Sequence, residues 1–210
     1  MRLRPAPRRG AIALALALAL HGEAAAELAP HSGRYGSLAL AVRDGKVSGV
    51  FAEGRGGADG MPSFSCIFLL EGALAGARAT VETWYPGEAE RIAGTLVFTA
   101  EGAELTLIED HGGCAMATGS MVGKPFTLPE ETPRAGADSE RWQDMGLVTA
   151  RRAALRSESG PAPRRGPYLV ANDPVAVLDR REGWVRVLYQ NGKAAVTGWL
   201  PVTELAVAAP

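Results

Sequence analysis

The sequence predicts an all-β protein with an N-terminal antiparallel β-meander of barrel-like form and a second, smaller β-barrel at the C-terminus. Two observations predict this class. Short runs with alternating apolar side chains recur along the chain, and glycine-containing turns separate them. No helical pattern interrupts the series, so the spacing is typical of sandwiches and barrels. Sequential hairpins favour a meander over two packed sheets with Greek-key crossings.

Residues 1–26 carry the features of a signal peptide. Four arginines form a basic start, Ala11–Leu20 is an apolar run of ten residues, and Ala24–Ala26 supplies small residues for cleavage. A run of ten is too short to span a bilayer, which takes about 20 residues. We therefore expect export to the periplasm, cleavage after Ala26, and no membrane span in the mature protein.

The meander is expected over residues 27–124. Asp44-Gly45 lies between two alternating apolar runs and predicts a tight hairpin turn. Phe64–Leu70 is apolar on both of its faces, which predicts a central strand covered on both sides. The further expected strands are Ala77–Trp84, Ile92–Phe98, Leu105–Ile108 and Met116–Met121.

A linker is expected over residues 125–141, which are rich in Pro, Glu and Gly and show no periodicity. The C-terminal domain is then expected over 142–210. Its strands are predicted at Val175–Leu178, Trp184–Tyr189, Gly198–Leu200 and Val202–Leu205.

Motifs in this last third resemble those of bacterial SH3 domains. They are Leu155-Arg156-Ser157, Asn172-Asp173, Gly183-Trp184-Val185-Arg186-Val187 and Gly198-Trp199-Leu200, in that order. The chain departs from the family in having Asn172 in place of a glycine and a loop that carries Arg164-Arg165. The resemblance implies an SH3-like small barrel that binds cell-wall peptide or a protein partner and does not catalyse.

Ligand contact in this domain is expected at Trp184 and Arg186. Val185 and Val187 alternate with them and should fill the core, with Trp199 closing one end of it. The alternative is that Trp184 packs against the linker or the other domain. Tyr168, Arg164 and Arg165 complete the candidate binding residues.

Cys66 and Cys114 are the only cysteines, and in an oxidising compartment an even pair predicts a disulfide. Bacterial SH3 domains often accompany cell-wall cysteine peptidases, so Cys66 as a nucleophile is the competing interpretation. It is disfavoured because an apolar strand raises the pKa of a thiol, whereas a nucleophile needs it lowered. We expect no catalytic residue, cofactor or metal site, since no Cys-x-x-Cys or His-x-x-x-His spacing occurs.

Charge divides the chain into two unlike parts. Residues 27–140 hold 8 basic and 16 acidic side chains, whereas residues 141–210 hold 10 basic and 6 acidic ones. The acidic part suits a cationic protein partner, such as a basic lysozyme that it would inhibit, and argues against nucleic-acid binding. The alternatives are an envelope hydrolase or its accessory subunit, and a carrier whose barrel holds an apolar ligand. Such a cavity would be lined by Phe64, Phe68, Trp84 and Phe98.

Overall fold

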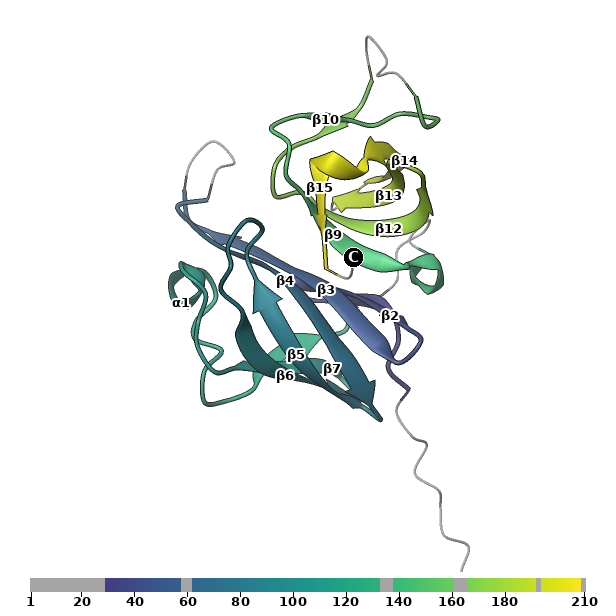
Figure 1. The fold of residues 1–210 in the computed structure, drawn as a ribbon. Helices are drawn as coiled ribbons and strands as arrows, with labels where there is room; N and C mark the ends of the chain where they lie inside the picture. Colours follow the sequence, from purple (N-terminus) through teal and green to yellow (C-terminus); the bar gives the residue numbers. More distant parts are fainter. Residues whose placement is uncertain (1–28, 58–61, 133–137, 161–165, 192–193, 209–210) are drawn as a thin grey trace, which may run out of the picture.

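The computed structural model describes residues 29–57, 62–132, 138–160, 166–191 and 194–208. The expected all-β fold class is confirmed (Figure 1): eight strands form one antiparallel sheet that is nearly closed into a barrel, and five form a second sheet. The expected signal peptide, residues 1–26, lies outside the described residues. Within the described residues, no helix is both long enough and apolar enough to cross a membrane.

The eight-stranded sheet, called the barrel domain below, is an uninterrupted meander in which neighbours in the sheet are neighbours in the chain. The expected hairpin turn at Asp44-Gly45 is present, with φ of 50° and 72°, the left-handed values that such a turn requires. The strands are β1 (Gly33–Tyr35), β2 (Leu38–Arg43), β3 (Lys46–Arg55), β4 (Phe64–Ala75), β5 (Arg78–Trp84), β6 (Ile92–Thr99), β7 (Gly102–Leu107) and β8 (Phe126–Pro129).

A short seam between β1 and the end of β8 brings the two edges of this sheet together. Tyr35 bridges to Glu130, and the amide of Glu131 donates to the Arg34 carbonyl at 2.8 Å. Two side-chain pairs cross the seam, Arg34 with Glu131 at 3.1 Å and His31 with Glu130 at 3.0 Å. The seam satisfies backbone groups that an open edge would leave exposed to other chains.

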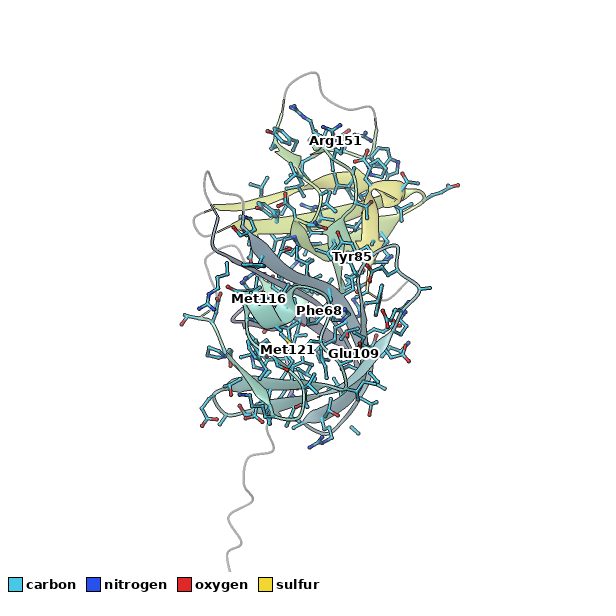
Figure 2. All side chains as sticks on the ribbon, turned by 90° about the vertical axis from the view of Figure 1, so that its left-hand side faces the viewer. Phe68, Tyr85, Glu109, Met116, Met121 and Arg151 are labelled. Carbon is cyan, nitrogen blue, oxygen red and sulfur yellow. A yellow bond between two sulfur atoms is a disulfide. The ribbon has the colours of Figure 1, made fainter. Side chains whose placement is uncertain are left out.

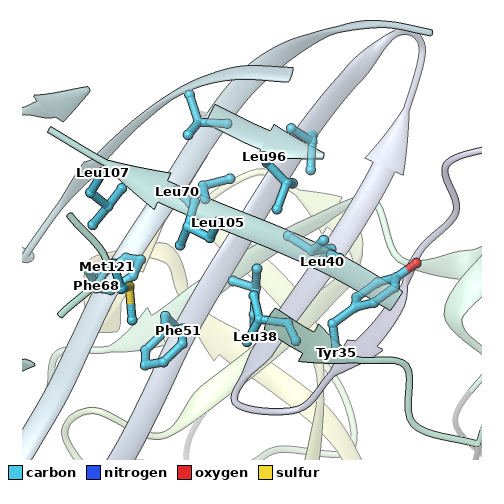
Figure 3. Close-up of a cluster of buried hydrophobic side chains, with 14 of the residues drawn as sticks. Tyr35, Leu38, Leu40, Phe51, Phe68, Leu70, Leu96, Leu105, Leu107 and Met121 are labelled. Atoms are coloured by element: carbon cyan, nitrogen blue, oxygen red, sulfur yellow. The ribbon is translucent and has the colours of Figure 1, made fainter. Parts of the chain in front are cut away.

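Large apolar side chains fill the barrel interior (Figure 3). Phe51 stacks on Phe68 with ring centroids 4.9 Å apart, and Tyr35 meets Phe98 edge-on at 5.6 Å. The following interior residues are fully buried: Leu38, Leu40, Leu70, Leu96, Leu105 and Met121.

Residues 108–125 leave the sheet between β7 and β8 and cover one edge of β4. They include the short helix α1 (Cys114–Ala117), so the prediction of a strand over Met116–Met121 is wrong. β4 pairs with β5 only from Leu69 onward, which leaves its first residues without a strand neighbour on that side. The expected disulfide between Cys66 and Cys114 ties the excursion to this free stretch.

The barrel extends beyond the expected boundary at residue 124. The expected linker over 125–141 begins with β8, which pairs with β7 from Phe126↔Leu105 to Pro129↔Gly102. Phe126 and Leu128 do alternate, but the flanking prolines and glutamates mask a four-residue strand in the sequence. A single 3₁₀ turn, η1 (Ser139–Arg141), then precedes the C-terminal domain.

The C-terminal domain is a five-stranded antiparallel sheet in the order β14-β13-β12-β9-β15, with β10 and β11 paired beside it. The strand expected at Val202–Leu205 is instead the 3₁₀ turn η2 (Val202–Glu204), and the strand follows it. The strands are β9 (Asp144–Val148), β10 (Ala153–Ala154), β11 (Tyr168–Leu169), β12 (Pro174–Arg181), β13 (Trp184–Asn191), β14 (Ala194–Pro201) and β15 (Leu205–Val207).

The two domains pack against each other through a shared apolar cluster. Outward-facing residues of the barrel, such as Leu69 and Trp84, meet Met145 and Leu188 of the C-terminal sheet. β9 lies across the outer face of β2 and β3 (Figure 1). At the domain boundary (Figure 2), the Tyr85 hydroxyl donates to Asn172 Oδ1 at 3.1 Å. This packing explains the predicted covered strand: Leu69 points away from the barrel interior and is still 0% exposed.

Candidate functional site: a basic aromatic face on the C-terminal domain

One face of the C-terminal sheet carries two tryptophans and three arginines. In an extended strand every second residue shares a face, so Trp184, Arg186 and Leu188 of β13 point the same way. Leu188 is buried in the cluster between the domains. The Trp184 end of β13 is therefore the part of this face that the barrel leaves open.

Trp184 lies half-buried at the start of β13, directly opposite Arg181 of β12 and Pro201 of β14. The guanidinium of Arg156 covers its ring, with the Cζ atom 4.4 Å from the ring centroid. A cation over an aromatic face is attracted by the ring's negative face. The stack fixes the position of Arg156 while leaving its charge uncompensated.

Trp199 repeats this arrangement on β14. The Arg181 Cζ lies 4.4 Å from the centroid of its ring, and Trp199 is buried to 5% exposure. Trp199 was expected to close one end of the valine core, and this prediction is wrong. Trp199 is paired with Arg186 and shares its face, whereas its neighbour Leu200 points into the core with Val185.

Arg186 sits between the two tryptophan–arginine pairs, flanked by Trp199 on one side and Asp179 on the other. Within the described residues, neither Arg186 nor Arg156 forms an ion pair with a carboxylate. The Nε of Arg156 is also buried without a hydrogen-bond acceptor in the same part of the chain. Only Arg181 has an acidic partner, Asp179, and that contact is long at 3.9 Å.

We call these five residues the basic aromatic face: Arg156, Arg181, Trp184, Arg186 and Trp199. A guanidinium stacked on a ring keeps its in-plane N–H donors, which match the two oxygens of a carboxylate. The half-buried ring of Trp184 adds flat apolar area with little conformational entropy to lose. The face is therefore suited to bind an extended, carboxylate-bearing ligand.

The other expected binding residues lie apart from this face or outside the described residues. Tyr168 is 49% exposed on β11, and its ring is covered by Arg152, at 3.9 Å, instead of by an arginine of the basic aromatic face. Arg164 and Arg165 lie outside the described residues. Of the residues expected to contact a ligand, the structure therefore brings Trp184 and Arg186 together with three residues that the sequence motifs do not group with them.

The sequence pattern alone does not group the other three members of the face, Arg156, Arg181 and Trp199. They come together only through the pairing of strands. Arg156 joins the face because it bridges to Trp199 from outside the sheet, 38 residues before the start of β14. Arg181 reaches Trp199 across β13. Neither relationship follows from the spacing of residues along the chain.

The cysteines and His111, which could have served in catalysis or metal binding, take part in structural interactions instead. Both cysteine sulfurs are bonded to each other, so neither is a free thiol. His111 is buried, stacks on Phe68 and contacts the Thr83 hydroxyl at 2.7 Å. Burial lowers the pKa of His111, while Glu88, Glu90, Asp110 and Glu109 act in the opposite direction. Across the described ranges, no cluster of three or more His, Cys, Asp or Glu side chains is placed to hold a metal ion.

Comparison of the chain with family models, with curated proteins and with solved structures gives no match in any of the three.

Proposed function

We propose that this chain is an exported, non-catalytic binding protein of the bacterial envelope, and that its C-terminal domain binds carboxylate-bearing cell-wall peptides. The observation that carries the proposal is the pair of arginine–tryptophan stacks, Arg156 on Trp184 and Arg181 on Trp199, on either side of Arg186. Uncompensated guanidinium groups beside flat rings favour anions on an extended chain. The resemblance to bacterial SH3 domains, which rests on the sequence motifs, supports the same ligand class.

Export is supported by the basic and apolar start of the chain and by the disulfide, which is typical of proteins in oxidising compartments. A binding role is favoured over the two alternatives by how the relevant side chains are used. Phe68 and Phe98 are packed in the barrel core, whereas Phe64 is exposed and Trp84 faces the C-terminal domain. These four do not line one cavity, which disfavours the apolar carrier, and the disulfide disfavours a thiol hydrolase.

The test is co-sedimentation of the purified protein with insoluble peptidoglycan, with Arg186→Gln and Trp184→Leu as the informative variants. We expect Arg186→Gln to weaken binding at least tenfold, since a charge-assisted hydrogen bond contributes about 1.5–3 kcal/mol. Trp184→Leu should weaken binding as well, because it removes the ring on which Arg156 is stacked. Raising the salt concentration should weaken binding as well. The matched control is Arg78→Gln, an exposed arginine of the barrel, which should bind like the wild type.

Failure of the wild-type protein to sediment with peptidoglycan at low salt would overturn the proposal, as would undiminished binding by both variants. A parallel arm with a basic lysozyme immobilised on beads examines the acidic barrel as a second binding surface. Capture there that survives Arg186→Gln would assign partner choice to the barrel domain.

A further inference from the structure

A cleft at the junction of the two domains, separate from the basic aromatic face, has a cavity volume of about 60 Å³. Its barrel side is the seam between β1 and β8, with Arg34, Glu130 and Glu131. Its other side comes from the C-terminal domain, through Trp142 and Gln190. Ligand sites commonly lie at such domain boundaries, and a cleft of this volume admits a few water molecules or one small charged group.

Two hydrogen-bond donors beside this cleft lack acceptors. Trp142 is 3% exposed, and its indole Nε1 has no hydrogen-bond partner in the described part of the chain. The Nε2 of Gln190 is buried and unpartnered in the same way. A buried donor without an acceptor costs the folded protein the full desolvation of that group, so nearly all such groups in native proteins are satisfied. Gln190 is only half-buried, which lets its amide turn toward a bound molecule.

The seam side of the cleft offers the complementary chemistry. Glu130 and Glu131 are each partly exposed, and in the described residues each carboxylate contacts one basic side chain, His31 at 3.0 Å and Arg34 at 3.1 Å. A carboxylate oxygen can accept more hydrogen bonds than these contacts use. The barrel side can therefore hold a positively charged group of a ligand, while an oxygen atom of the same ligand accepts a hydrogen bond from the C-terminal domain.

We propose that this cleft binds the amino end of a short peptide, with its ammonium group at Glu130 and Glu131 and its first carbonyl oxygen accepting from Trp142 and Gln190. The assignment follows from the residues that line the same small space: acidic side chains on one wall, and on the other two residues whose buried donors lack acceptors. It does not depend on the proposed function of the basic aromatic face. Because the ligand contacts both domains, its binding stabilises their packing.

The test is calorimetric titration of protein expressed from the full chain with the dipeptide amide alanyl-alaninamide, which has no carboxylate, and with its N-acetylated form. We expect saturable binding of the free dipeptide and at least tenfold weaker binding of the acetylated one, which lacks the ammonium charge. Trp142→Phe keeps an aromatic ring but removes the N–H, and it should weaken dipeptide binding about fivefold. Glu130→Gln should weaken it by a similar factor.

Trp142→Phe has a second readout that separates a ligand site from a structural contact. Because the bound dipeptide supplies the acceptor that the indole donor lacks, it should raise the melting temperature of the wild type more than that of the variant. An equal rise for the two proteins would show that the donor does not contact the ligand and would overturn the inference. Absence of dipeptide binding would overturn it as well.

Trp184→Phe is the matched control, since it makes the same change on the basic aromatic face and should leave dipeptide binding unaltered. Weakening by Trp184→Phe without weakening by Trp142→Phe would place the dipeptide on that face and would refute the cleft site. Loss of peptidoglycan binding in Arg186→Gln with intact dipeptide binding would show that the two sites are independent.

Discussion

Reduction of the Cys66–Cys114 disulfide should cost the protein a large share of its stability. The bond closes a loop with a sequence separation of 48 residues inside the barrel domain. In the chain-entropy model, a closed loop of this length lowers the entropy of the unfolded chain by an amount worth about 4 kcal/mol at 25 °C. For a chain of this size, that corresponds to a fall of about 8–16 °C in melting temperature.

The site of the disulfide determines where the reduced protein loosens first. The bond anchors residues 108–125 over the start of β4, where β5 provides no strand partner. A Cβ added at Gly113 would lie 2.6 Å from the Ser65 carbonyl oxygen, so the excursion lies directly against that edge. Once the bond is cut, the excursion is held only by packing and by a few hydrogen bonds, such as that between His111 and Thr83, and amides near Phe64–Phe68 should exchange faster.

Urea denaturation with and without dithiothreitol measures this effect, and hydrogen exchange locates it. The double variant Cys66→Ala/Cys114→Ala is the control, because reductant should not shift its transition. A loss below about 1 kcal/mol on reduction would refute the loop-entropy reasoning. Faster exchange spread evenly over both domains would refute the assigned location.

Two further predictions concern stability. Leu69→Ala removes a side chain that is buried between the domains and should lower the free energy of unfolding by about 2–5 kcal/mol, as for a core leucine; a change below about 0.5 kcal/mol in urea titrations would mean that the domains do not stay packed in solution. His111 has a pKa lowered mainly by burial, so below about pH 6.5 the unfolded chain takes up a proton that the folded chain refuses, and stability should fall as the pH falls through that region. His111→Gln should remove this part of the pH dependence, and parallel stability curves for the two proteins between pH 5 and 7.5 would contradict the assignment.

The sequence was most informative where local pattern and tertiary environment agree. Asp44-Gly45 predicted its turn because the left-handed backbone that it needs suits those two residues. The two apolar faces of Phe64–Leu70 predicted a covered strand, and the second cover is the C-terminal domain. The pattern showed that something packs on Leu69 without showing what does.

The predictions that were wrong also have physical causes. β8 is four residues long and ends on a proline, so its alternation is too brief to stand out from a linker. Met116 was placed in a strand because the helix there is a single turn, too short to show a helical period. Trp199 was assigned to the core because a large aromatic side chain usually lies there; it is buried by Arg181 on the opposite face.

The site was predictable only in part for a related reason. Trp184 and Arg186 lie two residues apart on one strand, so alternation alone groups them. The remaining members come from three other segments of the chain, and the cleft needs residues from both domains. Contacts between residues so far apart in the chain depend on the order of strands in each sheet and on how the sheets pack. Local periodicity in one sequence does not reveal either.

The close packing of the barrel on the C-terminal sheet has an electrical consequence. The sequence through residue 140 carries a net charge of −8 after the expected cleavage, and the remainder carries +4. Held in one orientation, these opposite charges give the molecule a permanent dipole moment. The electric field of an anionic surface orients such a dipole before the protein makes contact with the surface. The protein should therefore approach such a surface with its C-terminal domain leading, and its rate of productive encounter should decline as salt shortens the range of that field.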